Sequence, residues 1–162
     1  MRIPAQLQPE QVLALIDTRE QLPLDLSPLQ TGSATLATGD YSVKGLENIV
    51  AVERKSEGDL LGCVGRERER FEREVQRLLA YPVRCLVVES TWSAIELGHW
   101  RSKVSVNAVQ GSLIGWIAKG LPVAMIGTHD RAGQFVSRLL YTAARRRWQE
   151  CRRLVAEINN QV

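Results

Sequence analysis

Two short charged segments, joined through a polar turn, constrain this chain most. They are Gly39-Asp40-Tyr41 and Val52-Glu53-Arg54-Lys55. The runs at about 41–44 and 49–55 predict two strands, and the polar residues between them predict the turn of a hairpin. Because side chains alternate along a strand, Glu53 and Lys55 face one side and Arg54 faces the other. The carboxylates of Asp40 and Glu53 and the amine of Lys55 are therefore expected to converge on one patch.

Such a patch suits a divalent cation. Mg²⁺ takes about six oxygen ligands and keeps several waters, so one or two carboxylates and a substrate phosphate suffice to hold it. A cation bound by Asp40 and Glu53 would polarise a phosphate and lower the pKa of a bound water. Lys55 would orient that water or neutralise charge that develops on the phosphate. A Glu-x-Lys triplet alone is common on ordinary surface hairpins, so the surrounding sequence must show whether this one belongs to a metal site.

The wider pattern resembles one family. Its fixed positions are Asp17-x-Arg19-Glu20, Gly39-Asp40-Tyr41, Val52-Glu53-Arg54-Lys55 and Asp59. Together they are similar to the catalytic signature of the XPF-type structure-specific endonucleases, which reads Gly-Asp, a variable gap, Glu-Arg-Lys, three residues and Asp. The resemblance covers residues 12–89 most clearly and extends to about 140. It implies an α/β fold of the restriction-endonuclease-like group, with a mixed central sheet flanked by helices.

The resemblance also implies a set of catalytic residues. These would be Asp17, Asp40, Glu53, Arg54, Lys55 and Asp59. The metal, Mg²⁺ or Mn²⁺, would be bound by Asp40, Glu53, the backbone carbonyl of Arg54 and Asp17. Lys55 would orient the attacking water, and the side chain of Arg54 would brace its strand from the opposite face.

Two of these positions have another interpretation from the residues alone. Asp17 ends a buried apolar strand and can cap the turn at 18–21. Asp59 lies in the first turn of a helix that Ser56 is expected to cap, where negative charge is favoured by about 0.3–1 kcal/mol. The resemblance adds for Asp59 a supporting role, holding Arg54 or a metal-bound water.

The 162 residues are expected to form one nuclease domain, with a core at about 12–140 and a basic C-terminal helix at about 131–158. Its apolar fraction of 44% is that of an ordinary soluble globule. Hydrophobic periodicity predicts the remaining elements. They are a strand at 12–17, a mostly irregular stretch at 22–39 with a strand near Leu36, a helix at 56–81, a strand at 83–89, helices at 91–97 and 105–119, and a strand at 121–127.

Arginines are the candidates for DNA contacts. The formal net charge of +3 and the pI near 9.0 only mildly favour binding to polyanions such as DNA. In the helix at 56–81 most charges pair at i,i+4, which is typical of a solvated face. The resemblance implies that an arginine near the start of this helix approaches DNA, which favours Arg66 and then Arg70. In the last helix, Arg145 and Arg146 contact phosphates, or the helix contacts a second copy or partner subunit, or its basic face is merely solvated.

Other classes of protein fit less well. The three cysteines lack histidine companions, which argues against a zinc site and for a reducing compartment. The sequence has neither a membrane-length apolar run nor a signal-peptide pattern, so we expect a cytoplasmic protein with no membrane association. His99 and His129 lie outside the signature.

The expected function is metal-dependent hydrolysis of DNA phosphodiester bonds, at branched, forked or flapped DNA. Many relatives carry a tandem helix-hairpin-helix module after the nuclease domain, and this sequence resembles a standalone form without it. Selectivity would then be lost, or would come from a partner subunit or from a homodimer. Two alternatives remain open: a non-catalytic DNA-binding or scaffold subunit of a nuclease complex, and another phosphodiesterase, such as an RNase or a restriction-type enzyme.

Overall fold

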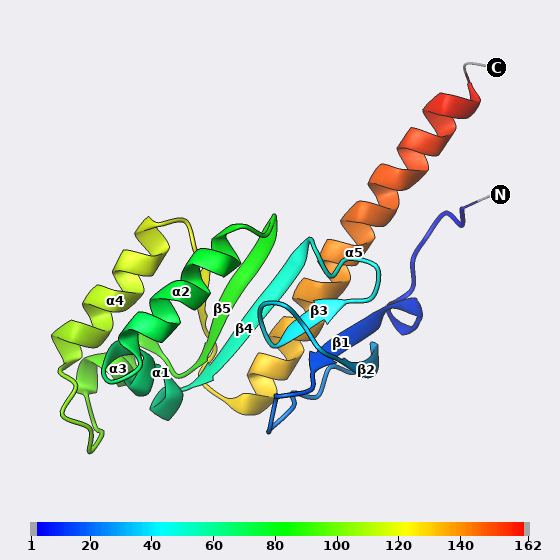
Figure 1. Cartoon of the computed structure of the whole chain (residues 1–162). Helices are drawn as coiled ribbons and strands as arrows, with labels where there is room; N and C mark the ends of the chain where they lie inside the picture. The colour runs from blue at the N-terminus through cyan, green and yellow to red at the C-terminus, as the bar shows by residue number, and fades with distance from the viewer. Residues whose placement is uncertain (1–2, 161–162) are drawn as a thin grey trace.

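Strands and helices alternate along the chain, as the sequence predicts for an α/β domain. A computed structural model describes residues 3–160 (Figure 1). Its elements are η1 (Pro9–Gln11), β1 (Leu13–Asp17), β2 (Gln30–Ala34), β3 (Tyr41–Val43), β4 (Val50–Ser56), α1 (Glu57–Val64), α2 (Arg68–Leu79), β5 (Val83–Glu89), α3 (Trp92–Leu97), α4 (Val106–Ala118), β6 (Val123–Met125) and α5 (His129–Asn159). None of the helices in this part of the chain is long and apolar enough to span a bilayer.

One mixed sheet organises residues 3–160. Its six strands lie in the order β2-β1-β3-β4-β5-β6. The pairs β1/β2, β4/β5 and β5/β6 are parallel, whereas β3 is antiparallel to both of its neighbours. The predicted hairpin is β3–β4, with Tyr41 opposite Val52. This confirms the predicted mixed central sheet.

Helices cover both faces of the sheet. In Figure 1, α5 lies behind the strands, and α1, α2 and α4 lie on the other side. The alternation along β4 accounts for this arrangement, because Val50 and Val52 pack in the core with α5 while Ala51 packs in the core with the other helices. A strand buried on both faces is apolar at successive positions, which is the pattern that predicted β5 as well.

The structure differs from the predicted elements at two places. The helix expected at 56–81 is two helices, because α1 ends at Gly65, where an added Cβ would lie 3.1 Å from Val104 Cγ2. The strand expected near Leu36 lies earlier, at 30–34, and Leu36 is a buried loop residue. The low β-propensity of Gln-Thr-Gly-Ser-Ala hides this edge strand, which pairing with β1 stabilises.

Candidate active site

The backbone of the β3–β4 hairpin places Asp40 beside the end of β4. The N–H of Asp40 donates to the carbonyl of Val52 at 2.8 Å, and one carboxylate oxygen, Oδ2, accepts the N–H of Arg54 at 2.8 Å. Gly39 makes this approach possible. It has a φ of +80°, and a Cβ there would lie 3.0 Å from the carbonyl oxygen of Val52. The Gly-Asp pair is thus a geometric requirement of the site.

Glu53 and Lys55 face the same side of β4, as strand alternation predicts. Lys55 Nζ lies 3.0 Å from Glu53 Oε1, and the ammonium also lies 5.3 Å from the centre of the Phe71 ring. Glu53 is only 7% exposed. Burial opposes the charge on Lys55, but the negative surroundings, chiefly Glu53, outweigh it and raise the pKa of the amine. Lys55 is therefore a protonated cation at neutral pH.

The two carboxylates of the hairpin, Asp40 and Glu53, both have raised pKa values. Burial raises the pKa of Asp40 to about 6, against the hydrogen bond from the Arg54 N–H. Burial and the charge of Asp40 raise the pKa of Glu53 to about 8, against the pull of Lys55. Both shifts favour the neutral acids, and a nearby positive charge would favour the ionised forms.

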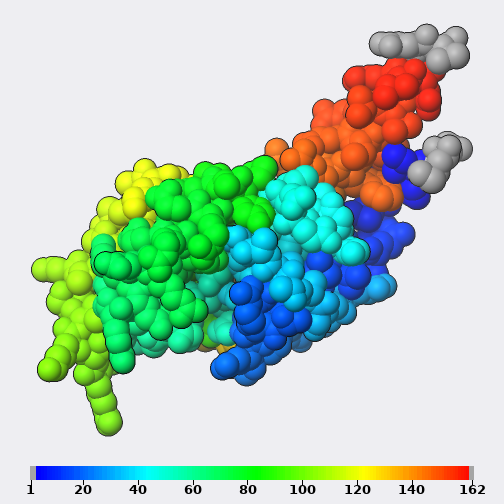
Figure 2. All heavy atoms as spheres, in the orientation of Figure 1, coloured from blue at the N-terminus to red at the C-terminus, as the bar shows by residue number. Residues whose placement is uncertain are grey.

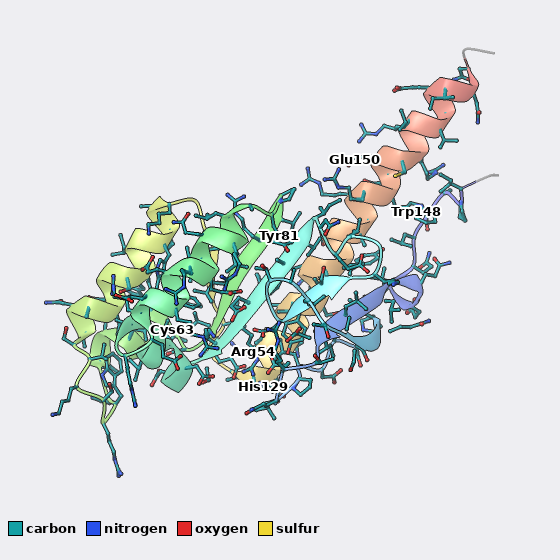
Figure 3. The ribbon with its side chains drawn as sticks, viewed as in Figure 1. Arg54, Cys63, Tyr81, His129, Trp148 and Glu150 are labelled. Carbon is teal, nitrogen blue, oxygen red and sulfur yellow. The ribbon has the colours of Figure 1, made fainter. Side chains whose placement is uncertain are left out.

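Arg54 points to the other face and joins three segments. Its guanidinium donates to both oxygens of Glu20, at 2.6 and 3.0 Å, and to Glu89 at the end of β5, at 2.7 Å. Glu20 also accepts the hydroxyl of Tyr41, and Glu89 lies 2.9 Å from Nδ1 of His129 (Figure 3 labels Arg54 and His129). The side chain of Arg54 is 8% exposed. These contacts support the bracing role predicted for Arg54.

Asp17 makes different contacts from those that the resemblance implies. Both of its oxygens accept from the guanidinium of Arg19, at 2.8 and 3.2 Å, and one also accepts the N–H of Leu36 at 2.9 Å. The carboxylate thus braces the loop that leads into the hairpin. The structure does not bring it into the pair formed by Asp40 and Glu53, and its role as a metal ligand stays a prediction.

Asp59 lies in the first turn of α1. Its N–H donates to Ser56 Oγ at 3.1 Å, which confirms the predicted cap, and the residue is exposed. It lines the same pocket as Asp40 and Lys55. Both interpretations of Asp59 are therefore compatible with its position.

Glu74 is a neighbour of the site that sequence reasoning missed. It lies on α2, where its carboxylate is 3.4 Å from the N–H of Gly39 and forms an ion pair with Arg77. Its negative charge helps to raise the pKa of Glu53. No local pattern singles it out, because it is one of several alternating Glu and Arg residues in α2.

A pocket of about 300 Å³ opens beside these groups. Its lining residues are Arg19, Glu20, Gln21, Leu22, Asp40, Arg54, Lys55, Ser56 and Asp59. A larger, mostly apolar hollow of about 580 Å³ lies elsewhere, between the N-terminal segment and α5. Of the two, the smaller one is lined by Asp40 and Lys55, so we take it as the candidate active site. Glu53 is not among its lining residues but lies beside it, 3.0 Å from Lys55.

The donor set of this pocket fits a hard divalent cation. Within residues 3–160, no group of three or more His, Cys, Asp or Glu side chains is close enough to hold a metal ion. Mg²⁺ and Mn²⁺ need fewer, because Mg²⁺ uses one or two carboxylates and keeps several waters. Arg54 adds a further oxygen: its N–H points to Asp40, and the carbonyl of a strand residue points to the same side as its N–H. Asp40, Glu53 and this carbonyl are the donors that fit.

The predicted DNA-binding arginines lie in two regions. Arg66 is exposed in the break between α1 and α2, and Arg70 is exposed on α2, 3.7 Å from Glu67. Arg145 and Arg146 are exposed on α5, sixteen and seventeen residues after His129, which places them about 24 Å along the helix from the site. The structure does not bring these two to the pocket, and all four DNA contacts stay predictions.

The fold and this pocket define a restriction-endonuclease-like α/β domain with an acidic pair and a lysine on its central hairpin. The chain belongs to the ERCC4 domain family, whose model matches residues 16–159. The structure is similar to XPF from Aeropyrum pernix, with a TM-score of 0.66 and 18% sequence identity, over 82% of this chain and 62% of that chain. No curated protein matches significantly. The predicted resemblance to an XPF-type nuclease domain is confirmed.

Proposed function

We propose that this protein is a divalent-metal-dependent DNA endonuclease. One observation carries the proposal: the hairpin of an ERCC4 domain brings Asp40 and Glu53 together with a protonated Lys55 beside an open pocket. Burial first, and then neighbouring negative charge, raise the pKa values of the two carboxylates, and a bound cation would favour their ionised forms. Mg²⁺ or Mn²⁺ would polarise the scissile phosphate and lower the pKa of a water.

Each side chain has a role that follows from its contacts. Asp40 and Glu53, with the carbonyl of Arg54, would hold the cation. The raised pKa of Lys55 keeps its amine protonated, so the amine cannot accept a proton from water. It would instead orient the water or stabilise negative charge on the phosphate. The guanidinium of Arg54 holds Glu20 and Glu89 and thereby fixes the end of β4.

The proposed substrate is DNA of branched, forked or flapped structure. The side chain of Arg19 is 70% exposed at the pocket, and Arg66 is exposed nearby in sequence, after α1. Phosphate contacts of this kind give affinity without sequence preference. A second copy or a partner subunit would supply the selectivity for structure.

Labelled duplex, single-stranded, forked and flapped DNA, each with Mg²⁺, Mn²⁺ or chelator, provide the test. Asp40→Ala and Lys55→Ala should each lower the cleavage rate by about 100-fold or more. Glu157→Gln, which removes an exposed carboxylate at the far end of α5, should cleave like the wild type.

A DNA-binding measurement beside this assay, and single-stranded RNA added as a competitor, separate the alternatives. DNA binding without metal-dependent cleavage would leave a non-catalytic binding or scaffold subunit and would contradict the proposal. Preference for single-stranded RNA in competition would instead indicate another phosphodiesterase.

A further inference from the structure

The long helix α5 carries most of the uncompensated positive charge of the chain. It contains seven arginines and three acidic residues, an excess of four positive charges, whereas the whole chain has a formal net charge of +3. By contrast, α2 alternates Arg and Glu, and its arginines pair with neighbouring carboxylates, such as Arg77 with Glu74. The positive charges on α5 are therefore not balanced by acidic residues of the same helix, unlike those on α2.

Four of these arginines form a stripe. Arg131, Arg138, Arg145 and Arg152 are spaced by seven residues. Seven residues fall about 20° short of two helical turns, so the four lie within about 60° of one another around the helix. The buried residues of α5, among them Val136 and Leu140, lie on the opposite side. We call these four residues the arginine stripe.

The stripe is open to solvent and free of acidic neighbours. Arg131, Arg138 and Arg145 are exposed, and Arg152 is half-buried, with one guanidinium nitrogen bonded to the carbonyl of Ala5 at 2.8 Å. The residues beside them are neutral: the polar Gln134, Thr142 and Gln149, and the half-buried aromatic rings of Phe135, Tyr141 and Trp148. The acidic residues of α5, Asp130, Glu150 and Glu157, lie off this face, and Glu150 pairs with Arg147 instead.

The stripe begins near the guanidinium of Arg54, on the face of β4 opposite to Glu53 and Lys55, and leads away from it. Its first member, Arg131, follows His129 by two positions in the sequence. His129 contacts Glu89, and Glu89 in turn contacts the guanidinium of Arg54. In Figure 1, α5 runs from that end behind the strands, and Figures 1 and 2 show its C-terminal part projecting from the body. Successive stripe arginines are about 10 Å apart and the whole stripe spans about 32 Å, close to one turn of B-DNA.

Surface hollows accompany the stripe along its length. They have volumes of about 490, 400 and 370 Å³ and are lined in turn by Arg131 and Arg138, by Arg145, and by Arg152. A phosphate backbone that follows the helix would find a guanidinium at each hollow. Arginine suits this contact because its planar fork donates two hydrogen bonds to one phosphate.

We propose that the arginine stripe is a second DNA-contact surface, which holds the sugar-phosphate backbone of a duplex arm that leaves the cutting site. The proposal rests on the proposed function only in taking DNA as the substrate. A membrane surface fits less well, because a membrane-bound helix needs a continuous exposed apolar face. The apolar face of α5 is buried in the core along the first half of the helix, and the second half exposes Leu154 and Ile158. The contacts go to phosphates, so they carry no sequence preference.

The test measures binding of the full chain to a fluorescein-labelled duplex of about 30 base pairs with chelator present, so that no cleavage occurs. Anisotropy is recorded from about 50 to about 200 mM salt, where phosphate contacts are most visible. Arg138→Gln with Arg145→Gln should weaken binding about 10-fold and lower the slope of log K against log salt by about 2. Arg138→Lys with Arg145→Lys keeps the charge and should bind within about twofold of the wild type.

Lys44→Gln with Lys119→Gln is the charge-matched control, because it also removes two exposed cations but leaves α5 intact. It should bind within about twofold of the wild type. The proposal is overturned if the double variant at Arg138 and Arg145 and the double variant at Lys44 and Lys119 weaken DNA binding equally, since net charge alone would then explain the loss. It is also overturned if Arg138→Gln with Arg145→Gln binds like the wild type. Phosphatidylserine vesicles that bind the chain as tightly as duplex, through Arg138 and Arg145, would also overturn it.

These outcomes are independent of catalysis. Stripe-dependent binding by a chain that does not cleave would leave the stripe standing and contradict the nuclease proposal. Metal-dependent cleavage, together with DNA binding that does not depend on Arg138 and Arg145, would support the nuclease proposal and contradict the stripe.

Discussion

The backbone N–H of Arg54 donates to Asp40 Oδ2 at 2.8 Å, while the side chain of the same residue reaches the opposite face of β4. One residue thus holds a carboxylate of the site with its main chain and holds Glu20 and Glu89 with its guanidinium. The position of Asp40 therefore depends on packing that lies on the far side of the strand.

Removing the guanidinium should destabilise the fold. In Arg54→Gln the carboxylates of Glu20 and Glu89, whose side chains are 5% and 12% exposed, lose their cation. Breaking such a pair costs about 3–5 kcal/mol, because a buried charge is left uncompensated. Urea unfolding at neutral pH measures the loss, and Arg147→Gln, which breaks only an exposed pair with Glu150, should cost less than about 1 kcal/mol.

A second substitution identifies the cause. Adding Glu20→Gln to Arg54→Gln removes one of the orphaned charges, so the double variant should be more stable than Arg54→Gln alone. If the two losses simply add, the buried charge is not the source of the instability.

The acidic pair predicts a dependence of stability on pH. Folding raises the pKa of Asp40 from 3.8 to about 6, so the folded state retains a proton that the unfolded state has lost between these pH values. The contribution of Asp40 to the free energy of unfolding is therefore full below about pH 4 and declines as pH rises to about 6. Relative to Asp40→Asn, the wild type should lose on the order of 2–3 kcal/mol over this range.

Urea unfolding at a series of pH values, with chelator present, measures this difference. Saturating Mg²⁺ should narrow it at pH 7, because the cation binds only the wild-type carboxylates and stabilises the folded state by mass action. Parallel curves for the two proteins from pH 4 to pH 7 would refute the raised pKa.

Lys55 should be needed for its charge and for its geometry. Lys55→Ala leaves Glu53 buried without its partner at 3.0 Å, so we expect the single-turnover cleavage rate to fall by about 100-fold or more. Lys55→Arg keeps the charge but replaces a compact ammonium with a planar fork, and it should recover only part of the rate. Full recovery by arginine would show that charge alone suffices.

Most of the fold could be predicted from the sequence, because the information is local. Alternation along β4 placed Glu53 and Lys55 on one side and Arg54 on the other, whereas the close approach of Gly39 to Val52 was seen only in the structure. The central strands β1, β4 and β5 followed from their apolar runs. The edge strand β2 did not, because its residues are polar and small and only its pairing with β1 makes it a strand.

The missing parts of the site are long-range contacts. Arg54 meets Glu20 and Glu89 across thirty-four and thirty-five positions, and Glu74 meets Gly39 across thirty-five. Nothing in the local sequence distinguishes these carboxylates from others that are solvated. The break at Gly65 was missed for a related reason, because the amphipathic pattern runs through it and only tertiary packing against Val104 shows it.

Glu74 offers a final test of the electrostatics. Its charge helps to raise the pKa of Glu53 to about 8, so Glu74→Gln should lower that pKa. Glu53 must be ionised to bind a cation, and the acidic limb of the rate profile should therefore move to lower pH in the variant. Single-turnover cleavage at subsaturating Mg²⁺ measures the profile, and Glu69→Gln, an exposed carboxylate on the same helix, is the matched control. A limb that stays in place, or moves to higher pH, would show that Glu74 does not act on Glu53.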